Sequence, residues 1–221
     1  MQRLMHLARS RYGVFTRDQA RRCGLTDDTL WRRTRSGLLV SEYRNVLRYS
    51  LIPPSFHQQL MAVCLRVPGS IWASHRGAAA LWGLDEVRPD IIEVTSSIPV
   101  YPGRSEVVVH RVSDMTARDT CVVAGIPATT VHRTLIDLGA VADAGVVEAA
   151  MESALRRGMT SIERLERRLR EIGGRGRRGV GVLRKVLERR EPGVPSTDSG
   201  LETSSFNCFG KEDFRNQIVK K

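Results

Sequence analysis

The sequence predicts an α+β protein, with an N-terminal winged helix-turn-helix, a mixed α/β domain after it, and a helical, basic region towards the C-terminus. Three observations support this class. Short helical patterns separated by glycines fill the first fifty residues, runs rich in β-branched residues then alternate with helical ones, and arginine-rich amphipathic patterns follow. The 221 residues, 41% of them apolar, suffice for one large or two small buried cores. We place the domain boundaries at 1–52, 53–191 and 192–221.

The chain opens with a predicted helix over 1–12, in which apolar side chains recur at helical spacing and which Gly13 ends. A short extended link follows. Thr16 is a good N-cap for the next helix, over 17–23, and Gly24 tolerates the left-handed conformation that ends it.

Thr26 caps a third predicted helix, which carries two aspartates in its first turn and closes at Gly37. Two helices joined by a tight glycine turn are typical of a helix-turn-helix. Residues 38–49 then predict a two-stranded ribbon that turns near 42–45. This ribbon is the expected wing.

The third helix predicts a DNA-binding surface. Leu30 and Thr34 share its inward face with Trp31 at the margin, which leaves an exposed face rich in arginine for the major groove. We favour Arg32 and Arg33 for groove or phosphate contact. The candidate DNA-binding residues on the second helix, the third helix and the wing are Arg17, Arg21, Arg22, Thr29, Arg32, Arg33, Arg35 and Arg44. The alternatives are solvated surface charge for any single arginine, and a protein-interaction module without steep salt-dependent DNA affinity for the whole segment.

Charge is distributed along the chain in blocks. Residues 1–50 hold eleven Lys or Arg against four Asp or Glu, residues 51–150 hold seven against ten, and residues 151–191 hold thirteen against six, within a net charge of +11. Two basic regions around a mildly acidic middle are typical of a protein with a polyanionic partner, although such a surface also serves solubility alone. Nucleic acid is therefore the favoured partner class.

The middle of the chain predicts a mixed α/β domain after a Pro53-Pro54 boundary. The expected elements are helices over 56–67, 74–82, 130–138 and 141–157, strands over 91–95 and 106–112 joined by a turn at 99–103, and a short strand and turn over 122–127. Two further helices, 159–171 and 180–190, flank a Gly/Arg segment at 173–179. That segment is either a flexible nucleic-acid contact or a solvated loop.

Several polar groups invite a catalytic interpretation that the spacing does not support. Ser74 and His75 are adjacent, and neighbours at a helix start point apart, so we expect a cap and a packing or surface histidine. No spacing connects the four titratable residues His110, His132, Asp114 and Asp137. The glutamates among the arginines, which predict ion-paired surface, are Glu152, Glu163, Glu166 and Glu171. We expect no enzyme activity, no cofactor and no metal.

The absence of membrane or secretory segments and of paired cysteines narrows the class of protein further. No stretch approaches the roughly 18 uninterrupted apolar residues of a membrane span and the N-terminus lacks an apolar secretory segment, so we expect a cytoplasmic protein without a membrane partner. The four cysteines lie far apart, without metal-ligand spacing, at Cys23, Cys64, Cys121 and Cys208. This scatter predicts buried thiols rather than disulfides or a zinc site.

Three segments of the chain resemble the AbiEi family of antitoxins and transcriptional regulators from type IV toxin-antitoxin systems, over about residues 1–202. They are the opening with Gly24-Leu25-Thr26 and Arg32-Arg33-Thr34-Arg35-Ser36-Gly37, the run Ser74-His75-Arg76-Gly77-Ala78-Ala79-Ala80-Leu81-Trp82-Gly83-Leu84, and the run Gly125-Ile126-Pro127-Ala128-Thr129-Thr130-Val131-His132-Arg133-Thr134-Leu135-Ile136-Asp137-Leu138. Where relatives often carry Arg-Gly-Val-Tyr in the wing, this chain has Arg44-Asn45-Val46-Leu47. Asparagine can replace glycine in a left-handed turn, so the wing is expected to survive.

The resemblance implies a winged helix that binds promoter inverted repeats and represses its own operon, and an α/β domain able to neutralise a nucleotidyltransferase-like toxin. Many relatives continue into an endonuclease-like domain similar to very-short-patch-repair (Vsr) nucleases, and Ser199-Gly200-Leu201-Glu202 is similar to the start of that domain. The later metal-binding residues of the family would lie past position 221, and Glu202 alone cannot assemble a hydrolytic metal site. The resemblance thus implies a truncated, inactive remnant over 192–221.

The composition changes near the end of the chain. Three of the four lysines fall in the last eleven positions, and two of the three asparagines and three of the five phenylalanines lie beyond Thr203. Either the ending is foreign to the reading frame or has drifted after loss of a downstream domain, or it is an ordinary C-terminus.

The sequence therefore predicts a non-enzymatic, sequence-specific DNA-binding regulator or antitoxin that represses its own promoter. Two alternatives stand. One is a truncated Vsr-like endonuclease without its catalytic core, and the other is an antitoxin that acts wholly through protein contact. The oligomeric state stays open, since an inverted repeat suits a dimer or two monomers side by side.

Overall fold

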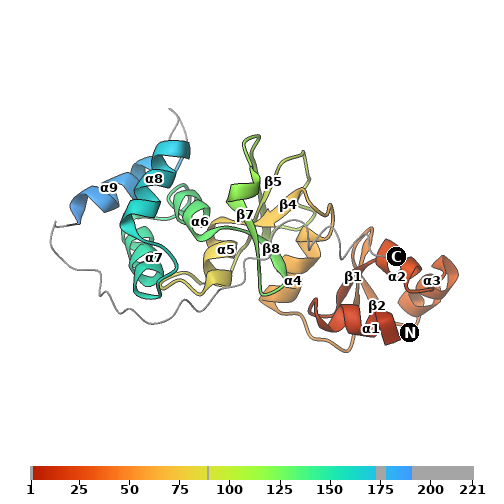
Figure 1. Cartoon of the computed structure of the whole chain (residues 1–221). Helices are drawn as coiled ribbons and strands as arrows, with labels where there is room; N and C mark the ends of the chain where they lie inside the picture. The colour runs from red at the N-terminus through yellow and green to blue at the C-terminus, as the bar shows by residue number, and fades with distance from the viewer. Residues whose placement is uncertain (1, 89, 173–177, 191–221) are drawn as a thin grey trace.

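The computed structural model describes residues 2–88, 90–172 and 178–190 of the 221. Within these residues the chain is mixed α+β, in agreement with the predicted class. The molecule is elongated in Figure 1: the elements of the first fifty residues lie at one end, a second sheet lies in the middle, and the last three helices lie at the other end.

The N-terminal unit combines three helices with a three-stranded antiparallel sheet of order β1-β3-β2. Its elements are α1 (Gln2–Arg9), β1 (Val14–Thr16), α2 (Arg17–Arg22), α3 (Asp27–Arg35), β2 (Leu39–Tyr43) and β3 (Val46–Tyr49). Thr16 caps α2 as predicted, because its Oγ1 accepts from the Gln19 N–H at 3.1 Å while Gln19 Oε1 accepts from the Thr16 N–H at 2.9 Å. Thr26 caps α3 through its hydroxyl. The arrangement is compatible with the predicted winged helix-turn-helix.

β1 and the start of β3 are buried on both faces of this sheet, because alternate side chains along a strand point to opposite faces and here enter different cores. Phe15 and Leu47 are register partners, and they belong to a small core shared with α1, α2 and α3. Val14 and Val46 belong instead to the large central core of the molecule, which includes α4 (Phe56–Cys64). The first fifty residues therefore share their packing with the middle of the chain.

The hairpin of β2 and β3 differs from the expected wing at its turn. The turn is Arg44-Asn45, shorter than the expected 42–45, because β2 extends to Tyr43. The prediction that Asn45 replaces a left-handed glycine is wrong, since its φ is not positive. Asn45 Nδ2 instead donates to the carbonyl oxygen of Arg66 at 3.0 Å. The turn is held against the middle of the molecule.

The middle of the molecule is a five-stranded mixed sheet of order β6-β5-β4-β8-β7 with helices packed on it. After α4 its elements are β4 (Ile71–Ala73), α5 (His75–Trp82), β5 (Ile92–Ser96), β6 (Val107–Arg111), a 3-10 helix η1 (Ala117–Asp119), β7 (Thr120–Val123), β8 (Ile126–Thr129) and α6 (Val131–Leu138). The helices lie where their patterns predict them. Gly83 ends α5 in the left-handed conformation, with φ of 66°.

Two features of this sheet differ from the expectation. β5 and β6 pair in parallel, so the segment 97–106 crosses from one end of the sheet to the other, and the turn expected at 99–103 cannot by itself join the two strands. β4 was not predicted at all, because its three residues are all buried and therefore show no alternation of polar and apolar side chains.

Three helices close the described part of the chain: α7 (Ala144–Arg156), α8 (Ile162–Ile172) and α9 (Val180–Arg189). The apolar stripe expected on α8 is buried at Leu165 and Leu169. Most of the Gly/Arg segment, 173–177, and the predicted nuclease remnant at 192–221 lie outside the described residues. No helix in the described ranges is long and apolar enough to cross a membrane.

The surface glutamates largely follow the predicted ion pairing. Ion pairs join Glu152 to Arg190 at 2.9 Å, Glu166 to Arg170 at 3.9 Å and Glu171 to Arg168 at 2.6 Å. Glu163 is engaged by a hydroxyl and not by an arginine among the contacts that the structure describes. A hydrogen bond from the Ser161 side chain lowers the pKa of the Glu163 carboxyl.

The cysteines are placed mainly as predicted. Cys64 and Cys121 are buried, whereas Cys23 is only partly buried. Burial raises the pKa of the Cys64 thiol to about 12, which makes it inert. Cys208 lies outside the described residues.

Candidate nucleic-acid interface

The outward side of α3 carries four exposed side chains at helical spacing. Asp28, Trp31, Arg32 and Arg35 are three, four and seven residues apart and so form one stripe. Leu30 lies fully buried on the opposite side, as predicted. We call the four exposed residues the α3 face. It is the surface that this helix can present to a partner.

Trp31 is the main surprise of the α3 face. We expected it at the margin of the inward face of the helix, yet it is 56% exposed and lies within the exposed stripe. The guanidinium carbon of Arg35 lies 5.2 Å from the Trp31 ring centroid, a cation–π contact. Exposed tryptophan and arginine together are typical of binding surfaces. The spacing of Trp31 from Asp28 and Arg35 was the signal that could have placed it there.

The polar side chains of α3 divide between the face and its flank. Arg32 Nη2 lies 2.9 Å from Asp28 Oδ2 one turn earlier, and both groups are exposed, so this pair adds little stability. Thr29 and Arg33 are half-buried on the flank, rather than on the solvent side where we expected them. The Thr29 hydroxyl lies 2.9 Å from that of Thr26, so it is engaged at the start of the helix. Of the two favoured arginines, only Arg32 lies on the exposed face.

The start of α2 and the β2–β3 turn are joined by hydrogen bonds. The Arg17 N–H donates to the carbonyl of Asn45 at 2.9 Å, and Arg17 Nε donates to the carbonyl of Arg44 at 3.0 Å. The Arg44 side chain is exposed and that of Arg17 is half-buried. The structure thus brings these two predicted arginines to one edge, which we call the basic edge.

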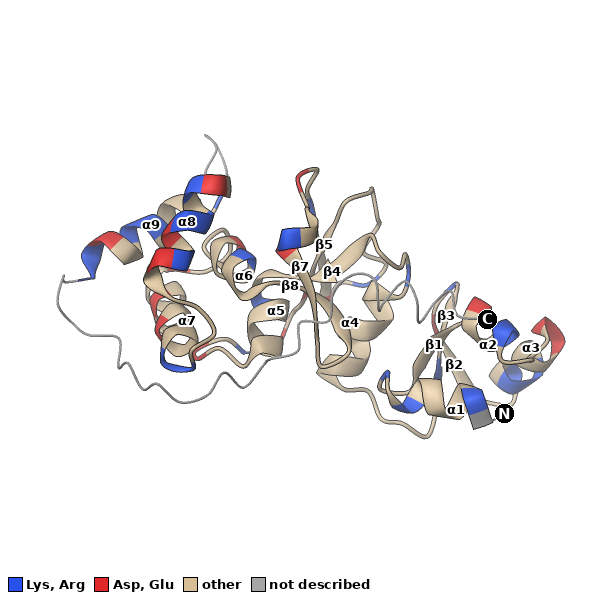
Figure 2. Ribbon diagram, in the orientation of Figure 1, with Lys and Arg blue, Asp and Glu red and all other residues tan. Residues whose placement is uncertain are grey.

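The remaining arginines of α2 differ in their engagement. Arg21 lies 2.6 Å from Asp18 and 3.0 Å from Asp27. The hydrogen bond and the charge of Asp27 raise the pKa of Arg21, so this guanidinium joins α2 to α3. Arg22 is exposed on the same helix. Figure 2 shows the resulting interleaving of basic and acidic segments along α2 and α3.

The residues that invited a catalytic interpretation form packing contacts. Contrary to expectation, Ser74 and His75 are in contact: Ser74 Oγ lies 2.8 Å from His75 Nδ1 and accepts from Thr95 Oγ1 at 2.8 Å. Ser74 therefore makes no side-chain cap bond to α5. His75 stacks on His110 with ring centroids 3.6 Å apart. Because Ser74 is fully buried and His75 is 5% exposed, the pair serves the packing of α5 on the sheet.

The other titratable residues considered in the sequence do not form one group, although Asp114 and Asp137 both lie near Arg133. Asp137 lies 2.8 Å and Asp114 lies 3.9 Å from the guanidinium of Arg133, whereas His132 lines a separate pocket. Within the described ranges, no three His, Cys, Asp or Glu side chains gather in a way that could hold a metal ion.

The α3 face and the basic edge lie in a segment that matches a known protein family. Residues 2–49 match the family of AbiEi antitoxin transcriptional regulators. The AbiEi match begins with α1 and ends at the last residue of β3, so it covers the N-terminal unit and its arginines. No curated protein matches this chain.

The fold as a whole has a counterpart among solved structures. The crystal structure of the RV2827C protein from Mycobacterium tuberculosis superposes with a TM-score of 0.52 and 21% sequence identity. The similarity covers 91% of this chain and 87% of that chain, so it extends well beyond the AbiEi match. At this level of identity the likeness shows a shared fold.

Proposed function

We propose that this protein is a sequence-specific, non-enzymatic DNA-binding regulator of the AbiEi antitoxin type that represses its own promoter. One observation carries the proposal: an exposed helical stripe with two arginines, the α3 face, lies inside the segment that matches a family of transcriptional regulators. A helix of this width suits the major groove of DNA.

In this proposal the N-terminal unit acts as a winged helix-turn-helix. Arg32 and Arg35 reach guanine O6 and N7, and Arg32 exchanges its exposed partner Asp28 for a base edge. The basic edge of Arg17 and Arg44 binds phosphates and so sets the position of α3 in the groove.

The proposed partners follow from the same match. The main partner is double-stranded DNA with inverted repeats at the promoter of the gene. The family description as an antitoxin supports a second partner, a nucleotidyltransferase-like toxin bound outside the N-terminal unit. Both partners place the protein in the cytoplasm.

The test is DNA binding by the full chain, measured by fluorescence anisotropy from 50 to 200 mM salt. The duplexes are the DNA upstream of the start codon and a scrambled sequence of equal length. We expect preferential binding to the upstream DNA that persists at physiological salt. Equal binding to both duplexes, lost by about 0.2 M salt, would show a basic surface without specificity.

Paired variants separate recognition from net charge. Arg32→Ala with Arg35→Ala should weaken promoter binding at least about tenfold, since a bidentate arginine–guanine contact contributes about 1–3 kcal/mol. The control pair is Arg88→Ala with Arg111→Ala, which removes the same charge from exposed positions outside the N-terminal unit. Equal losses in the two pairs would contradict recognition by α3.

A cleavage assay tests the non-enzymatic assignment. Incubation of the DNA with the protein and Mg²⁺ or Mn²⁺ should leave the DNA intact, and cleavage would overturn this assignment.

A further inference from the structure

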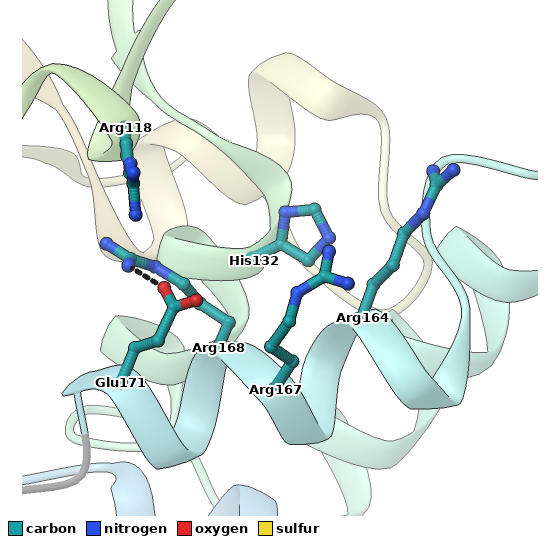
Figure 3. Close-up of a pocket in the computed structure, with 6 residues that line it drawn as sticks. All are labelled: Arg118, His132, Arg164, Arg167, Arg168 and Glu171. Carbon is teal, nitrogen blue, oxygen red and sulfur yellow. Dashed lines mark hydrogen bonds and ion pairs between the residues drawn. The ribbon is translucent and has the colours of Figure 1, made fainter.

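A pocket rich in arginine lies at the end of the molecule opposite to α3. It has a volume of about 290 Å³ and is formed by η1, α6 and α8. The residues that line it are Arg118, His132, Arg164, Arg167, Arg168 and Glu171 (Figure 3). Because α8 and α3 lie at opposite ends in Figure 1, this pocket is separate from the α3 face.

Three of the four arginines in this pocket form no ion pair with the described residues, although the charges of two of them, Arg118 and Arg167, act on the Glu171 carboxylate and help to lower its pKa after the hydrogen bond from Arg168. Arg168 is engaged, since its guanidinium lies 2.5 Å from Asp119 and 2.6 Å from Glu171. Arg118, Arg164 and Arg167 are exposed and form no ion pair with any acidic side chain in the described ranges. Like charges that line one pocket repel one another. An anion in the pocket would relieve that repulsion.

His132 adds an unpaired polar atom to the wall of the same pocket. Its Nε2 is buried and has no hydrogen-bond partner among the described residues. Burial, followed by the charges of Arg164, Arg168 and Arg167, lowers the pKa of the imidazole. The ring is therefore neutral at pH 7 and can offer one ring nitrogen to a ligand. In Figure 3 the ring lies beside the Arg167 side chain.

The base of the pocket is held in place before any ligand arrives. Asp119, which fixes Arg168, is 1% exposed and accepts from Thr116 Oγ1 at 2.6 Å. The arginines come from two elements, Arg118 from η1 and the other three from α8, so they approach the pocket from different directions. Guanidinium groups arranged in this way match the several oxygens of a phosphate group.

Size and local charge favour a small ligand over a long polyanion. A pocket of about 290 Å³ lies at the lower end of the range for small-molecule sites. The exposed glutamates Glu163 and Glu166 lie beside the arginines along α8. A duplex lying on this helix would meet these carboxylates, whereas the one carboxylate that lines the pocket, Glu171, is already engaged by Arg168 at 2.6 Å.

We propose that this pocket binds the diphosphate or triphosphate group of a small molecule. Arg118, Arg164 and Arg167 donate to the phosphate oxygens, and the Nε2–H of the neutral His132 ring donates to the same group. This inference is independent of the proposed DNA-binding function, because it concerns residues outside the N-terminal unit.

The first test is calorimetric titration of the full chain with pyrophosphate at 150 mM salt and pH 7.5. We expect one site per chain and a micromolar dissociation constant. Arg164→Gln with Arg167→Gln should weaken binding at least tenfold, and Arg118→Gln should weaken it from a different element. The control pair Arg170→Gln with Arg184→Gln removes two exposed charges from α8 and α9 outside the pocket, and should change affinity by less than twofold.

A second readout follows the histidine itself. An anion in the pocket favours the imidazolium, so pyrophosphate should raise the pKa of His132. NMR measures this pKa, and the His132→Gln variant assigns the signal.

The proposal is overturned if titration with up to 10 mM pyrophosphate gives neither heat nor an NMR change, or if the pocket pair and the control pair weaken binding equally. It is also overturned if a 12-bp duplex of unrelated sequence displaces pyrophosphate and loses affinity only in the pocket pair, because the site would then belong to a nucleic-acid backbone.

Discussion

Arg133 is only 1% exposed, and its contacts show what the strongest sequence motif in the middle of the chain does. Its Nε donates to both carboxylate oxygens of Asp137, at 2.8 and 3.0 Å, and its Nη1 lies 3.8 Å from Asp119. A buried guanidinium is stable only with such partners. Arg133 and Asp137, within the run from Gly125 to Leu138, therefore serve the packing of α6.

Arg133→Ala should destabilise the protein by about 3–5 kcal/mol, because it removes the guanidinium that bonds both carboxylate oxygens of the buried Asp137 and leaves Asp119 with Arg168 and Thr116 alone of its three partners. Urea denaturation measures the change. Arg167→Ala, which removes an exposed arginine, is the matched control and should cost less than about 0.5 kcal/mol. A loss below about 1 kcal/mol for Arg133→Ala would show that the carboxylates find other partners.

The stacked pair of His75 and His110 makes stability depend on pH. Burial lowers the pKa of His75 to about 2, with further lowering by His110, Arg133 and Arg76. The folded state thus keeps His75 neutral, while the unfolded chain takes up a proton below its usual pKa of about 6.5. This contribution to stability is complete above that value and is lost progressively as the pH falls towards 2, so about 2 kcal/mol disappears by pH 5.

Chemical denaturation between pH 8 and pH 5 checks this pH dependence. His75→Gln should flatten the slope in part, since the pKa of His132 is also lowered. His6→Gln, at an exposed position, should leave the slope unchanged. A free energy of unfolding that stays constant from pH 8 to pH 5 in the unmodified protein would rule out a buried neutral His75.

At the scale of elements, helix starts could be predicted where the capping side chain has no competing partner. Thr16 and Thr26 cap α2 and α3 as the sequence indicates. Ser74 occupies the same position at α5 but makes no cap bond, because His75 and Thr95 engage its hydroxyl. Local sequence does not contain such tertiary partners.

Strand direction and the phase of α3 were harder to predict, for a similar reason. The composition of β5 and β6 predicts two strands but not their parallel pairing, which depends on the course of the segment between them. On α3 the arginine content pointed to the right helix. The exposed stripe nevertheless includes Trp31 and not Arg33. Consecutive side chains lie about 100° apart around the helix axis, so a small error in the predicted rotation of α3 changes which side chains face solvent.

The composition of the α3 face leads to a prediction for this helix. Asp28 engages Arg32 and places a negative charge on a surface proposed to meet phosphates. Asp28→Asn should therefore raise affinity for DNA of any sequence by about three- to tenfold at low salt, with a smaller gain at higher salt. Asp85→Asn, which breaks the exposed pair with Arg156, is the control and should have no effect on DNA binding. Unchanged affinity in Asp28→Asn would place this face away from the DNA.

At the scale of the molecule, the N-terminal unit is joined to the middle by polar contacts as well as by Val14 and Val46. Glu42 is bonded by Arg48 and by Arg104, the latter at 2.7 Å. The Tyr12 hydroxyl donates to the carbonyl of Ala124 at 2.7 Å. The arginine pocket, at α8, and the α3 face lie at opposite ends of the molecule in Figure 1. Any coupling between the two sites has to pass through contacts of this kind.

Glu42 and Arg104 should show the energy of this connection in a double-mutant cycle of Glu42→Gln and Arg104→Gln. The carboxylate is 6% and the guanidinium 34% exposed, so solvent screens the pair only partly, and we expect a coupling of about 1–2 kcal/mol by urea denaturation. The cycle of Asp28→Asn and Arg32→Gln is the control, since both groups are exposed and should couple by less than about 0.5 kcal/mol. Equal couplings in the two cycles would mean that Glu42 contributes no more than a surface pair. The orientation of α3 would then depend on the remaining contacts, which are the apolar ones of Val14 and Val46 and the hydrogen bonds of Tyr12 and Asn45.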